Sequence, residues 1–239
     1  MPPKPRFDTT RWSVVLAVRG AATEDSRAAL ETLCEQYWYP LYAYLRSAGH
    51  SAADAEDLTQ GFFLRLLEKD ALQAADPRRG RFRSFLLTAL KHFALNEWDR
   101  RRAQKRGGAQ PVLSLEFAAG EQKYQLEPSD HSTPETVYER QWALTVMARA
   151  TDRLRAECHK ARKDELFRHL KVYLPPDEGG PAYAETAAAS GMTEGAVKVA
   201  VHRLRQRYND LLREEIAQTV ASPHEIADEH RHLTSTIRR

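Results

Sequence analysis

The chain has 239 residues, of which 42% are hydrophobic and 29% are charged, an ordinary soluble balance with enough apolar material for small helical cores. The net charge of +3 is modest, so an anionic partner would have to meet local clusters of basic residues. The two cysteines, Cys34 and Cys158, lack paired spacing, which argues against a disulfide framework or a zinc site and favours a reducing cytoplasm. We expect neither a signal peptide nor a membrane span, because no stretch approaches the ~18 apolar residues that a span needs.

Helical periodicity dominates two long segments of the chain, and strand signals are almost absent. About thirty residues rich in glycine and proline, without a sustained helical period, separate the two segments and are long for a loop inside one domain. We therefore predict an all-α fold of two helical domains joined by an irregular linker. The predicted parts are an N-terminal extension (1–25), a first helical domain (26–106), a linker (107–134), a second helical domain (135–217) and a polar C-terminal tail (218–239).

The first domain opens with ALETLCEQYWYPLYAYLRSAG, which predicts an apolar helix that is kinked or broken at Pro40. The next helix, AADAEDLTQGFFLRLLEKD, carries an apolar stripe and, beside it, a polar row with a central glycine. This row suits docking against a partner helix because glycine permits close approach, but the row taken alone favours a plain solvated face with a tolerated glycine. The row consists of Asp57, Gln60, Gly61, Leu64 and Glu68.

The third helix of this domain, RFRSFLLTALKHFALNEWDRRRAQKR, follows a turn at 76–80 and is strongly basic. Basic groups interleaved with aromatic rings suit single-stranded nucleic acid, because the charges follow the backbone and the rings stack on unpaired bases. Phe82 and Phe93 share a helical stripe with Leu86 and are expected in the core, whereas Trp98 is a candidate for stacking. The basic residues are Arg78, Arg79, Arg81, Arg83, Lys91, Arg100, Arg101, Arg102, Lys105 and Arg106.

The second domain contains two predicted helices, TPETVYERQWALTVMARATDRLRAE and DELFRHLKVYL, followed by a pair of helices around Gly191. The spacing of Ala187, Gly191 and Val197 fits a helix-turn-helix, which needs a small residue, a left-handed turn and an aliphatic anchor at these places. Thr193 can cap the second helix of the pair through its hydroxyl.

The last long helix has two different faces on a 100° wheel. We expect one face to be buried, and the opposite face to present a basic and polar mixture that suits a DNA major groove, with an exposed valine for a thymine methyl. An amphipathic helix with a solvated basic side is the alternative. The buried face is Val197, Val201, Leu204, Tyr208 and Leu211; the outer face is Gly195, Val199, His202, Arg203 and Gln206, flanked by Lys198 and Arg205.

Three segments, in this order, resemble the extracytoplasmic-function (ECF) group of bacterial RNA polymerase sigma factors. DAEDLTQGFFLRL resembles the region 2 segment that binds the clamp helices of the polymerase β′ subunit. RGRFRSFLLTALKHFALNEWDRRR resembles the segment that melts and reads the −10 promoter element. YAETAAASGMTEGAVKVAVHRLRQRY resembles the region 4 helix-turn-helix that reads the −35 element.

The resemblance implies a role for each set of residues, without catalytic residues, metal or cofactor. It implies binding of core RNA polymerase (β′ clamp helices and β flap) and promoter DNA in the cytoplasm, with an anti-sigma factor as a further candidate partner. Gly61, His92 and Val199 depart from the usual family pattern. The implied residues are Asp57, Gln60, Gly61 and Leu64 for core polymerase; Arg78, Arg79, Arg81, Arg83, Lys91, His92, Trp98, Arg100 and Arg101 for −10 DNA; and Thr193, Glu194, Lys198, Val199, His202, Arg203 and Arg205 for −35 DNA.

Two other functions have to be weighed against a sigma factor. A free-standing helix-turn-helix regulator would use only the C-terminal helices and would need neither the polar row nor the aromatic and basic helix. An enzyme is disfavoured, because His224, Glu225 and His230 do not form an HExxH motif and lack an apolar scaffold. We therefore predict a non-enzymatic sigma factor.

Overall fold

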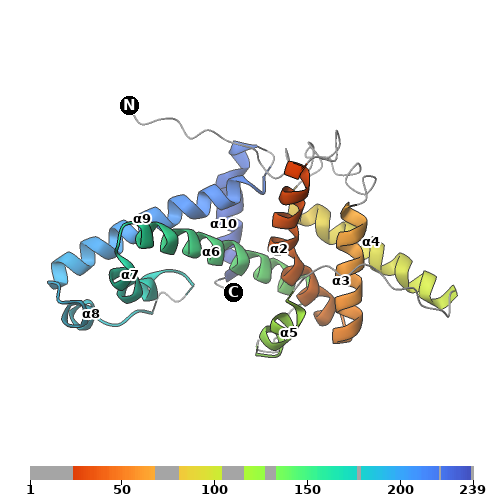
Figure 1. Ribbon diagram of the computed structural model, residues 1–239, viewed down its shortest axis with the longest axis horizontal. Helices are drawn as coiled ribbons and strands as arrows, with labels where there is room; N and C mark the ends of the chain where they lie inside the picture. The colour runs from red at the N-terminus through yellow and green to blue at the C-terminus, as the bar shows by residue number, and fades with distance from the viewer. Residues whose placement is uncertain are drawn as a thin grey trace. The chain divides into compact units, whose positions relative to one another are not determined.

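The computed structural model describes residues 24–67, 81–103, 116–126, 133–176, 179–220 and 222–237, and every regular element within them is a helix (Figure 1). The predicted all-α fold is confirmed for this part of the chain. The chain divides into two compact units. The first unit comprises the residues up to Trp142 and those from Ala217 to Glu229; the second comprises Ala143–Ile216 and the residues from His230 onward.

The first unit is built on three long helices, α2 (Glu24–Ser47), α3 (Ala52–Leu67) and α4 (Phe82–Ala103). Helix α3 packs against both α2 and α4. The predicted stripe of α3 is buried at Ala55, Leu58, Phe62 and Leu66. Helix α2 continues through Pro40 without a break.

Aromatic rings link these three helices. The ring of Tyr37 on α2 meets Phe82 on α4 edge-on, with 5.6 Å between centroids. Phe62 on α3 lies 5.9 Å from Phe93 on α4. Tyr37, Phe62 and Phe82 are all buried, so the rings form the core that fixes the outer surfaces of α3 and α4.

The turn between α2 and α3 follows local backbone rules. Gly49 has a φ of 95°, a conformation that side chains rarely adopt. The Ser51 hydroxyl then accepts the backbone N–H of Asp54 at 3.1 Å and donates to its carboxylate at 2.7 Å. This reciprocal cap starts α3 at Ala52.

A short helix, α5 (Phe117–Leu126), occupies the segment for which the sequence predicts an irregular linker. It packs on α2 through Phe117, whose ring lies 5.4 Å from that of Trp38. Glu121 accepts hydrogen bonds from the Tyr42 hydroxyl at 2.5 Å and from Arg46 Nε and Nη2 at 2.9 Å each. These contacts with α2, rather than a helical period of its own, hold the segment in place.

The second unit surrounds the C-terminal part of α6 (Pro134–Lys160), with α7 (Asp164–Leu170), η3 (Lys171–Tyr173), α8 (Tyr183–Ser190) and α9 (Glu194–Ala217). The helices α7, α8 and α9 and the turn η3 share one hydrophobic cluster. Its buried members are Leu170, Tyr173, Ala187, Val197 and Val201.

Ion pairs fasten the C-terminal half of α9 to α6. Glu215 is almost fully buried and accepts from Arg149 Nε at 3.0 Å and from Arg153 Nη1 at 2.9 Å. Nearer the start of α9, Arg207 donates to both carboxylate oxygens of Glu157. Since residue numbers rise along α6 as they fall along α9, the two helices run antiparallel.

The segment expected to be a polar C-terminal tail contains η4 (Pro223–Glu225) and α10 (Ile226–Ile237). The Ser222 hydroxyl accepts the backbone N–H of His224 at 3.4 Å, and Pro223 occupies the first position after it. Helix α10 buries Glu229 and Leu233, so this part of the chain is folded and adds to the interior.

Candidate nucleic-acid interface

The predicted polar row lies on one side of α3, opposite its buried stripe. Asp57 is exposed, and Gln60, Gly61 and Leu64 are half-buried. Gln60 Nε2 donates to the Glu56 carboxylate at 3.3 Å, which holds its amide along the helix. The row therefore offers a carboxylate, an amide and an apolar side chain to a partner; Glu68 lies outside the described residues.

The C-terminal half of α4 presents a mixed basic and apolar surface. Lys91 and His92 are exposed, and Trp98 is 62% exposed. Lys91 Nζ is 2.6 Å from Glu135 Oε1, and it lies 5.5 Å from the centre of the Tyr44 ring. The hydrogen bond from Lys91 lowers the pKa of the Glu135 carboxyl group below its ordinary value.

A hollow of about 850 Å³ lies beside this surface, between α2, the start of α3 and α4. Its lining is mostly apolar, and Leu95, which is 56% exposed, stands with Trp98 on the α4 side. Tyr44 and Lys91 also line it. A ring-lined hollow next to a cation can accept a flat, uncharged ring beside an anionic backbone, which is the chemistry of an unpaired nucleotide.

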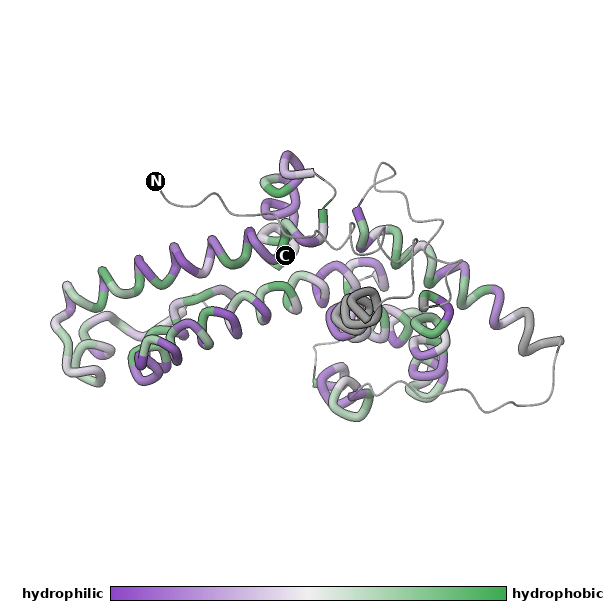
Figure 2. The backbone as a smooth tube through the Cα atoms, turned by 45° about the horizontal axis from the view of Figure 1, so that its top comes forward, coloured by the Kyte–Doolittle hydropathy of each residue, from purple (hydrophilic) through white to green (hydrophobic). Residues whose placement is uncertain are grey.

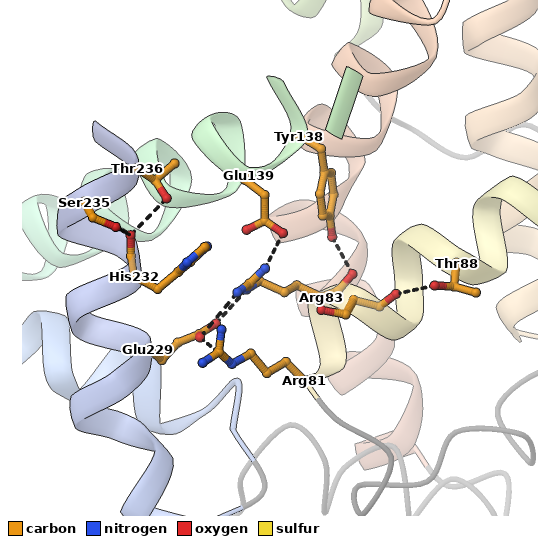
Figure 3. Close-up of polar contacts among 10 residues, drawn as sticks. Arg81, Arg83, Thr88, Tyr138, Glu139, Glu229, His232, Ser235 and Thr236 are labelled. Atoms are coloured by element: carbon orange, nitrogen blue, oxygen red, sulfur yellow. Dashed lines mark hydrogen bonds and ion pairs between the residues drawn. The ribbon is translucent and has the colours of Figure 1, made fainter. Parts of the chain in front are cut away.

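The two arginines at the start of α4 differ sharply in their surroundings (Figure 3). Arg83 is 3% exposed; its Nε donates to Glu229 Oε1 on α10 at 2.7 Å, and its Nη1 contacts Glu139 on α6. Its guanidinium also stacks 4.8 Å from the ring of Trp142, and its backbone carbonyl accepts the Tyr138 hydroxyl at 2.9 Å.

These contacts correct the sequence interpretation of Arg83. Burial lowers the pKa of a guanidinium, but the hydrogen bonds and charges of Glu229 and Glu139 outweigh that effect and raise the pKa of Arg83. The side chain is thus a buried cation with two carboxylate partners, not a surface group that faces −10 DNA. We therefore exclude Arg83 from the residues of the candidate DNA surface.

Arg81, two residues earlier, keeps part of its side chain at the surface. Its Nε is 2.8 Å from Glu229 Oε2, and the side chain is 33% exposed. Arg78 and Arg79 lie outside the described residues. Arg100 and Arg101 belong to α4, but their side chains are outside the described part.

The turn between α8 and α9 has the geometry that its sequence predicts. Gly191 is left-handed, with φ 65° and ψ 23°, and the N–H groups of Gly191 and Met192 both point to the Ala187 carbonyl. The Thr193 hydroxyl accepts the backbone N–H of Ala196 at 3.2 Å, so the predicted cap of α9 is confirmed. Ala187 and Val197 meet in the buried cluster.

Helix α9 carries buried residues on one side and exposed residues on the other, and Figure 2 shows hydrophobic and hydrophilic residues alternating along it. Leu204 is half-buried, and the other four residues of the predicted inner face are buried. All five residues of the predicted outer face are exposed, with Val199 50% exposed. The outer face is Gly195, Val199, His202, Arg203 and Gln206.

Three charged residues of α9 that were predicted to contact −35 DNA have partners within the chain. Lys198 Nζ is 2.7 Å from Glu194 Oε1, one turn away on the exposed surface. Arg205 Nε donates to the carbonyl of Tyr173 at 2.9 Å, and the side chain is half-buried. Exposed pairs such as Glu194–Lys198 contribute little stability and can exchange partners, whereas Arg205 also ties α9 to η3.

Residues 33–104 match the family model of Sigma-70 region 2. The match contains α3, most of α2 and all of α4, and so includes the polar row and the basic surface described above. The match supports a sigma-factor role for this chain in promoter recognition by RNA polymerase. Sigma-70 factors are non-enzymatic initiation factors. Comparisons with curated proteins and with solved structures gave no significant match.

Two features are absent from the part of the chain that the structure describes. No helix there is both long and apolar enough to cross a membrane. The same part of the chain contains no cluster of three or more histidine, cysteine, aspartate or glutamate side chains suited to a metal ion.

Sequence reasoning missed Glu229, Glu139 and Glu121, the carboxylates that engage arginines of the first unit.

Proposed function

We propose that this protein is a sigma factor of the ECF type, which binds core RNA polymerase, recognises −10 and −35 promoter elements and opens the promoter. The observation that carries the proposal is the Sigma-70 region 2 match over residues 33–104, which spans both the polar row of α3 and the basic surface of α4. In the cytoplasm, the partners would be the β′ clamp helices, the β flap and promoter DNA, with an anti-sigma factor as a further candidate.

We assign core-polymerase binding to Asp57, Gln60, Gly61 and Leu64. The half-buried glycine leaves room for a partner helix to approach, and the exposed carboxylate can pair with a basic residue of that helix. The position of this row on a helix whose opposite side is buried supports the assignment, because a rigid element holds its contact groups in place.

We assign −10 recognition to the surface of α4 and its hollow. Lys91 and His92 supply donors for the DNA backbone, and Trp98 and Leu95 supply an exposed apolar platform for an unstacked base. Capturing such a base offsets part of the cost of separating the strands, so promoter opening would need no nucleotide hydrolysis. Arg78, Arg79, Arg81, Arg100 and Arg101 remain part of this proposal.

We assign −35 recognition to α9 and its capped start. Val199, His202 and Arg203 are exposed on the side opposite the core and suit the edges of base pairs in a major groove. Thr193, Glu194 and Lys198 lie at the start of the helix, where this kind of motif contacts the DNA. The tie from Arg205 to the Tyr173 carbonyl gives that arginine a supporting role beside a possible phosphate contact.

The test is reconstitution of the full chain with core RNA polymerase, followed by mapping of transcript 5′ ends on genomic DNA. We expect a stable holoenzyme and initiation downstream of a shared two-part sequence. Failure to form a holoenzyme, together with tight binding of a palindromic duplex by the free protein, would identify a free-standing regulator that uses only α8 and α9.

A further inference from the structure

Glu229 is a carboxylate in an unusual position. It lies on α10 near the C-terminus, is 1% exposed, and accepts from the two arginines that begin α4 (Figure 3). Arg83 Nε approaches one of its oxygens at 2.7 Å, and Arg81 Nε approaches the other at 2.8 Å. A buried charge is costly unless it is paired, so this double pairing explains why α10 can place an acidic side chain there.

The two arginines do not depend on Glu229 to the same degree. Arg83 also contacts Glu139 and stacks on Trp142, and these partners belong to α6. Arg81 is one-third exposed and lies at the outer edge of the cluster. Arg81 can therefore leave Glu229 without stranding the buried carboxylate, because Arg83 would still neutralise it.

Arg81 is also one of the arginines assigned to −10 DNA. Carboxylates and phosphates bind a guanidinium through the same donors, so a guanidinium that holds Glu229 is not available in the same geometry to a phosphate. We propose that α10 is an autoinhibitory element, in which Glu229 occupies Arg81 until a DNA phosphate replaces it. This proposal rests on the proposed function, since it concerns the nucleic-acid surface of α4.

The arrangement explains how such a device could be reversible. Arg83 and Glu229 form the inner pair, which keeps α10 in register with the start of α4. Arg81 and Glu229 form the outer pair, which a competing anion can reach from solvent. DNA binding would exchange only the outer pair, so α10 need not unfold.

The experiment measures binding of the full chain to a fluorescently labelled oligothymidine of 12 nucleotides, over a range of salt concentrations. This probe reports phosphate contacts and requires no knowledge of the promoter. Glu229→Gln should release Arg81, so that binding gains the full free energy of about one phosphate contact. A single-strand contact makes the slope of log affinity against log salt more negative by about 0.7, which corresponds to roughly fivefold tighter binding at about 0.1 M salt.

Asp228→Asn is the matched control. Asp228 is exposed on the same turn of α10, and its substitution removes the same single negative charge as Glu229→Gln. We expect it to change the affinity less than twofold. The double variant Arg81→Gln/Glu229→Gln should lose the gain of Glu229→Gln. Equal gains in Glu229→Gln and Asp228→Asn would overturn the proposal, since net charge would then explain both, and so would the absence of any gain in Glu229→Gln.

Arg81→Gln alone keeps the test decisive if Glu229→Gln fails to fold. Its inner pair is intact, and an occupied Arg81 predicts less than a twofold change in oligothymidine binding. A fivefold loss would mean that Arg81 contributes a full phosphate contact to binding in spite of Glu229, and would refute autoinhibition. Holoenzyme assembly is a separate measurement: its failure would remove the proposed function, while the oligothymidine comparison would still report on the contact between α10 and α4.

Discussion

Two valines on α9, two residues apart, provide a direct test of the assignment of a buried face and an outer face on this helix. Val197 is 0% exposed within the cluster of Leu170, Tyr173, Ala187 and Val201, whereas Val199 is 50% exposed. Val197→Ala removes two buried carbons, which costs about 1.6 kcal/mol in transfer free energy and up to about 3 kcal/mol when the cavity does not close. Val199→Ala makes no cavity and should stay within about 0.5 kcal/mol of the native stability.

Amide hydrogen exchange of α9 measures this difference locally, which matters because the chain has two units and need not unfold in one step. Since about 1.4 kcal/mol is a factor of ten, Val197→Ala should lower protection in α9 by about 15- to 150-fold, and Val199→Ala by less than about threefold. Val199→Ala should instead weaken binding of a −35 duplex. Equal loss of protection in the two variants would refute the assignment of buried and outer faces on α9.

Three more predictions concern other residues. Arg203→Gln should weaken −35 duplex binding by about 1–3 kcal/mol and relax specificity at one base pair, measured with competing duplexes; a uniform loss with a shallower salt slope would mean a phosphate contact. Asp57→Arg should reduce holoenzyme assembly in a binding titration and leave oligothymidine binding intact, and unchanged assembly would remove Asp57 from the interface. Burial and nearby Arg213 lower the pKa of His230 below its ordinary 6.5, so the folded state favours the neutral ring. Its stabilising contribution is complete above pH 6.5 and is lost as the pH falls toward the lowered pKa, so His230→Leu should lose less thermal stability than the native chain between about pH 7.5 and about pH 5.5; identical losses would contradict this.

Hydrophobic periodicity was sufficient to predict which side of a helix is buried when that side is set by the residues of the helix alone. The buried stripe of α3 and the inner face of α9 follow from apolar residues spaced three and four apart, and the structure buries them as predicted. The turn at Gly191 and the cap at Thr193 are equally local, because each depends on residues within five positions along the chain.

The contacts of Arg83 and of α5 depend on partners far along the chain, and the sequence could not predict those partners. Arg83 stands three and seven residues before Leu86 and Leu90, on the apolar side of α4, and this spacing was a readable sign of burial. Its partner Glu229, however, is 146 residues away. Helix α5 buries only Phe117 and Gly120, too few residues to form a period.

The start of η4, which leads directly into α10, did carry a local signal, in the order serine, proline and glutamate at Ser222, Pro223 and Glu225. Serine caps a helix, proline suits the first position after the cap, and an acidic residue suits the first turn. The polar composition of the last residues concealed this signal, because the helix buries an acidic side chain as well as Leu233.

The contacts that hold α9 in place also have a consequence for how promoter preference could change during evolution. The ion pairs of Glu215 and Arg207 with α6 hold the C-terminal half of the helix, and the valine stripe holds its beginning. The outward side chains at 199, 202, 203 and 206 contribute to neither. Under the proposed function, substitutions there would be selected by the DNA alone, so paralogues or engineered variants could acquire new promoters while keeping the same scaffold.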